Sequence, residues 1–286
     1  MTSSDPFGAA SFGLASALAW GAGDYGGGLL SRRASGLGII LVSQVVGMAI
    51  AVAIAVLRTE PWPGAADVGW SIVSGVAGVV GISCLYRGLA VGRMGTVAPV
   101  TAVLAAALPV LAGVLLVGLP SPVVLLGIGL AIVAVLLVSR VSAGEGSGRE
   151  GLGLALTAGA ALGTFNITIA HLTAGLVFGP LAIVRGVQAL SVVAIIATTR
   201  TPWRLSDRIL PLALIVGVLD MSGNAFFILA RQAGQLATAA ALSSLYPVTT
   251  VILAAAFLHE RITVIHALGI AAAAAAIVLI TTGSTV

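Results

Sequence analysis

Long apolar runs separated by short polar breaks fill the whole chain. Each run is close to the ~20 residues that a helix needs to cross the hydrocarbon core of a bilayer. The breaks are rich in arginine, glycine and proline, which is typical of loops between membrane helices. The pattern therefore predicts an all-α integral membrane protein with ten transmembrane helices, at residues 7–30, 36–57, 67–91, 96–118, 121–140, 150–173, 177–199, 208–230, 236–258 and 263–282.

Composition excludes a soluble globule. Of the 286 residues, 59% are hydrophobic and 8% are charged, whereas a soluble domain has charges on about a quarter of its positions. The net charge of +4 comes with 13 basic residues, all arginine, that are scattered in small groups between apolar runs. No group is long enough for a nucleic-acid surface, so no nucleic-acid partner is expected.

The residues that most enzymes and metal sites require are scarce. Without lysine, the chain has neither a Walker-type phosphate loop nor a Schiff-base nucleophile. Cys84 is the only cysteine, and the three histidines fall in separate segments, which makes no metal signature. We expect a protein that is not an enzyme, with no cofactor and no catalytic or metal site.

The chain also repeats itself. Sliding one half against the other aligns glycines that are 142 positions apart, without a gap, at Gly21 and Gly163, Gly75 and Gly217, Gly81 and Gly223, Gly92 and Gly234, and Gly127 and Gly269. We predict two five-helix repeats, at 7–140 and 150–282. Because five is odd, the second repeat must enter the membrane inverted relative to the first. Inverted repeats recur in secondary transporters, where the substrate binds near the midplane.

Several polar residues fall near the middle of predicted helices, where an ionisable group costs about 3 kcal/mol. Asp220 and Asn224 lie one turn apart, Arg185 and Gln188 share another helix face, and Asp24 lies in the first helix. One interpretation is that they bind substrate or carry a coupling proton. The alternative is that Arg185 and Asp220 form a structural ion pair.

Three further residues are candidates for the same site. Asn166 occupies the position of the second repeat that matches Asp24. Trp20 and Tyr246 are aromatic residues beside the polar positions, and aromatic faces suit cationic or ring-bearing cargo. The predicted substrate-binding set is therefore Trp20, Asp24, Asn166, Arg185, Gln188, Asp220, Asn224 and Tyr246.

Short motifs in the chain resemble the EamA domain of the drug/metabolite transporter superfamily. They are Trp20-Gly21, Arg185, Tyr246-Pro247 and His259-Glu260-Arg261-Ile262-Thr263 with Gly269. The resemblance implies ten helices in a five-plus-five inverted arrangement around a central cavity that opens alternately to each side. The first copy departs from the pattern, because Gly118 stands where the second has Glu260 and Ser43 stands where it has Arg185.

These features together favour a secondary transporter that moves a small metabolite or drug-like molecule by alternating access, driven by protons or by exchange. The alternatives are a membrane-embedded enzyme acting on lipid and a channel. We expect a multi-pass protein of the cell membrane, either monomer or homodimer, whose partners are a small-molecule substrate and the lipid bilayer. Arginines favour the odd-numbered loops, which places both termini outside the cell by the positive-inside rule; the family resemblance implies termini inside.

Overall fold

The computed structural model describes residues 6–117, 121–142, 148–169, 171–173, 175–233, 242–243, 245–260 and 263–283. This part of the chain is helical throughout, without strands. Its helices are α1 (Pro6–Ser31), α2 (Gly36–Leu57), α3 (Ala65–Val91), α4 (Met94–Val117), α5 (Pro122–Ser142), α6 (Gly148–Ile169), α7 (Phe178–Thr199), α8 (Leu210–Ala233), α10 (Tyr246–Leu258) and α11 (Val264–Gly283).

The helices follow the predicted segments to within a few residues where both can be compared. Residues 236–241 and 244 of the ninth predicted segment, 236–258, lie outside the described residues, and α10 covers Tyr246–Leu258 of it. Pro247 lies in the first turn of α10, where a proline fits a helix start because its missing N–H would have no helical partner. Apolar content alone gives no sign of this start. Gly234, Arg261 and Ile262, which belong to the predicted repeat and motifs, lie outside the described residues.

Five helices in the described part of the chain are long and apolar enough to cross a membrane. They are α2, α3, α6 from Glu150, α7, and α8 as far as Ala230; shorter apolar helices occur within α4, α10 and α11. Large apolar side chains are exposed on helices across the bundle, including Leu18, Val52, Leu190, Ile215 and Ile252. A polytopic membrane protein is the arrangement in which such side chains meet lipid rather than water.

Helices from the two halves of the chain pack in antiparallel pairs. The start of α2, at Gly38, lies against Trp203 beyond the end of α7, and Glu60 after α2 reaches the start of α7 at Phe178. In the α1–α8 pair, Ser16 donates to the Gly223 carbonyl while Gly26 faces Val216.

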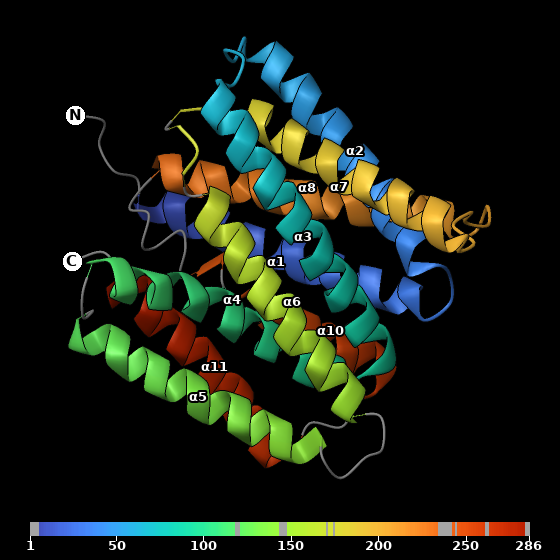
Figure 1. Ribbon diagram of the computed structural model, residues 1–286. Helices are drawn as coiled ribbons and strands as arrows, with labels where there is room; N and C mark the ends of the chain where they lie inside the picture. The colour runs from blue at the N-terminus through green and yellow to red at the C-terminus, as the bar shows by residue number, and fades with distance from the viewer. Residues whose placement is uncertain are drawn as a thin grey trace.

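The α3–α6 pair is likewise antiparallel, because Ser74 meets Thr168 and Gly88 faces Leu154. In Figure 1, α2 and α7 lie side by side at one edge of the bundle, and α5 and α11 lie together at the opposite edge.

Glycines that match in the repeat make matching contacts. Gly21 on α1 faces Tyr246 on α10, and Gly163 on α6 faces Leu104 on α4. The two glycines are 142 positions apart, and so are their partners Leu104 and Tyr246. Because glycine has no side chain, the two helices of each pair approach each other closely. Small residues have the same effect at other membrane helix interfaces. The Thr250 hydroxyl uses this closeness to donate to the Gly21 carbonyl at 3.0 Å.

We predict that Gly21→Ala destabilises the protein while Gly153→Ala does not. A methyl group on Gly21 would overlap the Tyr246 carbonyl and the Thr249 side chain, whereas Gly153 has nothing within 4 Å. Overpacking of this kind costs about 1–3 kcal/mol. Thermal unfolding of the purified variants in one detergent measures the difference. Equal unfolding midpoints would show that the α1–α10 contact is not tightly constrained.

Candidate functional site

Arg185, near the middle of α7, joins three helices. Its Nη1 forms an ion pair with Oδ2 of Asp220 on α8 at 2.5 Å and donates to Oε1 of Gln44 on α2 at 2.7 Å. Only 7% of Arg185 is exposed, so the guanidinium is withdrawn from solvent and lipid by its neighbours. Such a buried cation needs a paired carboxylate, because desolvation is otherwise too costly. The Arg185–Asp220 ion pair, which the sequence analysis gave as one of two interpretations of these residues, is present in the structure.

Glycines on the flanking helices make this geometry possible. Gly217 on α8 lies against the backbone of Ser43, which brings α8 close to α2 one turn from Asp220. Gly47 on α2 borders the Arg185 side chain. A larger residue at position 47 would meet Arg185, and one at position 217 would push α8 away from α2.

Asp24 on α1 lies beside this ion pair. The neighbouring Gly23 faces the backbone of Asp220, and the two carboxylates are close enough to interact electrostatically. No described residue donates a hydrogen bond to the Asp24 carboxylate or pairs with it as a cation. The result is one guanidinium for two carboxylates, so the group has an unbalanced negative charge when both acids are ionised.

Aromatic rings enclose the Asp24 side of the group. Tyr246 interacts electrostatically with Asp24, and its ring meets Trp20 edge-on with centroids 6.3 Å apart. Trp20 also contacts Phe227, at 5.8 Å between centroids. Tyr86 is 2% exposed, lies against Gly27 on α1, and interacts electrostatically with Asp24, Asp220 and Arg185.

We call Asp24, Gln44, Arg185 and Asp220 the polar cluster, and Trp20, Tyr86, Phe227 and Tyr246 its aromatic wall. The cluster draws on α1, α2, α7 and α8, and the wall adds α3 and α10. Both repeats contribute, so neither half of the chain contains the arrangement by itself. Among the described residues, no group of three His, Cys, Asp or Glu side chains is placed to hold a metal ion.

Three predicted residues have side chains that make no hydrogen bond to the side chains of the polar cluster. Asn224 donates to the backbone carbonyl of Asp220, not to its carboxylate. Asn166 is exposed and donates to the Ala105 carbonyl on α4 at 3.2 Å. Gln188 is buried with its amide against Gly78, and its Oε1 has no donor among the described residues. The sequence match between Asn166 and Asp24 therefore does not bring these two side chains together.

Gln44 and Tyr86 were absent from the predicted set. Gln44 is the only amide side chain in the apolar stretch of α2, and that isolation was a usable signal. Tyr86 gave no signal beyond its aromatic character. Its position depends on the approach of α3 to α1 at Gly27, which is a tertiary contact.

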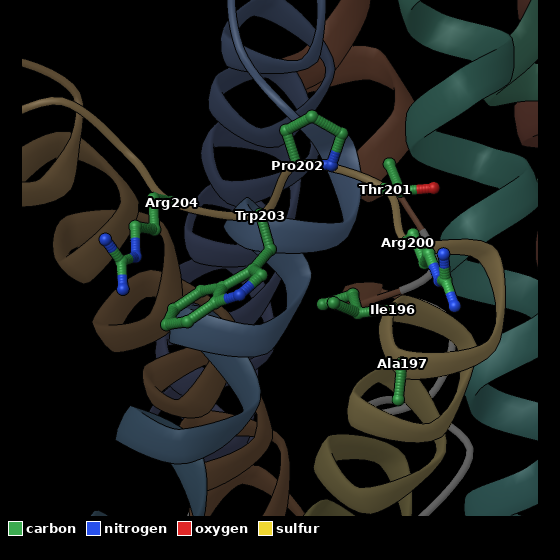
Figure 2. Close-up of a pocket in the computed structure, with 7 residues that line it drawn as sticks. All are labelled: Ile196, Ala197, Arg200, Thr201, Pro202, Trp203 and Arg204. Carbon is green, nitrogen blue, oxygen red and sulfur yellow. The ribbon is translucent and has the colours of Figure 1, made fainter.

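Two hollows in the structure lie away from the polar cluster. The larger, of about 440 Å³, is at the connection from α7 to α8, where Figure 2 shows Ile196 and Trp203 between Arg200 and Arg204. The smaller, of about 10 Å³, lies between α4, α10 and α11. Neither is lined by a residue of the polar cluster, so neither is the central cavity that the family resemblance implied.

We predict that Asp220→Asn destabilises the protein by about 3 kcal/mol, because it leaves the Arg185 cation buried without its carboxylate. Combining it with Arg185→Gln removes both charges. The double variant should therefore lose less unfolding free energy than the sum of the losses in the two single variants. Unfolding measured in detergent for the four proteins of this cycle tests the coupling. Additive losses would show that the two charges do not stabilise each other.

The chain shares its sequence pattern with one family of known proteins. A model of the EamA-like transporter family matches residues 8–140 and again residues 149–282. No curated protein matches the chain significantly. The two matches cover nearly the whole sequence as tandem repeats, and they agree with the helical, apolar architecture. This chain is therefore a multi-pass membrane protein that belongs to the EamA-like transporter family.

Proposed function

We propose that the protein is a secondary transporter that carries a small organic molecule across the cell membrane by alternating access, driven by protons or by exchange. Membership of a transporter family is the observation that carries the proposal. The polar cluster adds support, since buried ionisable groups in a membrane protein typically mark a substrate or proton pathway.

The proposal includes ten membrane crossings in two inverted repeats, at 7–140 and 150–282. Antiparallel packing supports it: α2 runs opposite to α7, its repeat equivalent, while α1 runs opposite to α8 and α3 opposite to α6. If α1 and α3 share one direction, as expected for the first and third crossings of a repeat, α6 and α8 share the other. Repeats of opposite direction let one site open to either side.

Within this proposal, the polar cluster and its aromatic wall form the cargo site. Asp24 supplies the uncompensated charge, and Trp20 and Tyr246 supply ring faces beside it. Asp220 and Gln44 hold Arg185 in position. The side chains of Gln188, Asn166 and Asn224 make no hydrogen bond to the side chains of the cluster, and in this proposal they line the path of the cargo once the helices move.

Carboxylates close one end of the bundle. Glu60, after α2, accepts hydrogen bonds from the backbone N–H groups at the start of α7, including that of Phe178 at 2.9 Å. Asp67 accepts from the N–H and the hydroxyl of Thr173, at 2.8 and 3.1 Å. Both acids belong to the first repeat, and both segments that donate to them belong to the second. Carboxylates at a helix N-terminus are favoured by its unpaired N–H groups and dipole.

A matching contact closes the opposite end. Glu260, after α10, accepts from the N–H groups of Met94 and Gly95 at the start of α4, each at 3.2 Å, and lies 3.6 Å from Arg32. Arg32 precedes α2 and Glu60 follows it, so the length of a 22-residue helix, about 33 Å, separates the two closures. Alternating access requires each closure to open in turn.

We expect Asp24→Asn and Asp220→Asn each to abolish cargo flux into proteoliposomes, while Glu150→Gln leaves it unchanged. Glu150 pairs with Arg87 on the exposed surface, so its variant controls for the loss of one carboxylate. Flux of a labelled metabolite mixture, followed with and without a proton gradient, is the measurement. Unchanged flux in both cluster variants would remove Asp24 and Asp220 from the transport path.

A second prediction concerns the two closures. In a Cys84→Ser chain, a short bis-methanethiosulfonate that bridges Asp67→Cys to Thr173→Cys, or Arg32→Cys to Glu260→Cys, should stop flux, and reductant should restore it. The control pair, Gly153→Cys with Thr157→Cys, bridges one exposed turn of α6. Each single-cysteine chain is treated in parallel, so that only an effect of the bridge counts.

Continued flux with either bridge in place would show that the closure concerned does not open during transport. If the control pair also stopped flux, the reagent would be acting on the membrane or on the fold rather than on the closures.

A further inference from the structure

We infer that the cargo is an organic monocation, an amine or quaternary ammonium compound, bound between the Asp24 carboxylate and the rings of Trp20 and Tyr246. The inference rests on the proposed transport function and specifies the chemistry of that site. Four observations carry it: the charge balance, the occupied arginine, the placement of the rings, and an unsatisfied buried donor.

The charge balance comes first. The polar cluster has two carboxylates and one guanidinium, and Asp24 is the acid without a cationic partner among the described residues. Its charged neighbour Asp220 has the same sign, which makes a second negative charge there unfavourable. One positive charge delivered beside Asp24 neutralises the cluster. A proton or a cationic cargo supplies it equally, so the two compete for one place, as exchange requires.

Arg185 does not offer a site for an anion. Its guanidinium is paired with Asp220, hydrogen-bonded to Gln44 and 7% exposed. An anionic or zwitterionic cargo would have to displace Asp220 and leave that carboxylate next to Asp24. The structure therefore disfavours a negatively charged cargo group at Arg185.

The rings are placed for a cation. Trp20 precedes Asp24 by four residues, so both lie on one face of α1. Tyr246 on α10 is near Asp24 and meets Trp20 edge-on, with centroids 6.3 Å apart. Gly223 on α8 lies directly against the Trp20 ring and fixes its position. Aromatic faces beside a carboxylate attract ammonium groups through the ring quadrupole, and tryptophan is the strongest of them.

An unsatisfied donor marks the cluster as incomplete. The Nε–H of Arg185 is buried and has no acceptor in the described part of the structure. Buried donors are nearly always paired in native proteins, so one left over in a polar site has a functional explanation or an unseen partner. The Nε lies beside Gly47 on α2, so an acceptor on the cargo supplies that partner only if it extends past Arg185 to α2.

Three compounds of nearly equal shape test the inference: choline (cation), glycine betaine (zwitterion) and 3,3-dimethylbutan-1-ol (neutral). Benzyltrimethylammonium adds a larger cation. Binding to the purified full chain is followed by tryptophan fluorescence and by ligand-induced thermal stabilisation. We expect at least one of the two cations to bind. Glycine betaine and the alcohol should bind at least about tenfold more weakly, since a charge-assisted contact is lost.

Variants assign the binding to Asp24. Asp24→Asn should weaken cation binding at least about tenfold, Asp24→Glu should keep most of it, and Glu150→Gln should not change it. Trp20→Leu should lower the affinity for the cations and leave the already weak affinity for the neutral compound unchanged. If Asp24→Asn fails to fold, Asp24→Glu and Trp20→Leu still decide the matter through the ratio of cation to neutral affinity.

Equal binding of the three matched compounds, or cation binding that Asp24→Asn leaves intact, would overturn the inference. A flux panel of cations, zwitterions, anions and neutral metabolites separates this result from failure of the proposed function. If zwitterions or anions were transported and cations were not, the inference of a cationic cargo would be wrong, while the proposed transport function would stand. Absence of flux for every class, in protein shown to be folded, would reject both.

Discussion

The structure depends on one buried cation. Arg185 lies in the interior of a chain that has almost no other charge inside its helices, and its pairing with Asp220 and Gln44 fixes the relative positions of α7, α8 and α2. A guanidinium cannot remain unpaired in so apolar an environment, so any movement of these helices must keep the ion pair or replace it. The cluster therefore constrains which helices move together and which do not.

Glycine makes that arrangement possible throughout the bundle. Where helices of the two halves meet, one helix presents a glycine and the other a larger side chain, as Gly81 does to Leu162 and Gly223 to Trp20. Between helices in lipid the hydrophobic effect is weak, and close van der Waals contact stabilises their packing instead. Smooth glycine surfaces also allow helices to shift without the interlocking that bulky side chains would impose.

Charges at the ends of the bundle serve a different purpose from the charge at its centre. Glu60 and Glu260 accept hydrogen bonds from the N-termini of helices of the opposite repeat. In the transport mechanism that we propose, these are the contacts that open, and contacts of this kind are individually weak and reversible. The central pair, by contrast, is shielded and persistent, while Asp24 beside it has a charge that only a transient partner can balance.

The sequence by itself determined the helices, their apolar outer faces, the repeat, the family and the residues that had to be buried and polar, because period, length and transfer free energy are local properties of the chain. It could not determine which polar groups meet. Asp24 and Asn166 match in the repeat, yet one lies in the cluster and the other on an exposed face, because packing of α1 against α8 and of α6 against α4 surrounds them differently. Gln44 joined Arg185 for the same reason: a contact across 141 residues is decided by helix packing in three dimensions, which no local pattern contains.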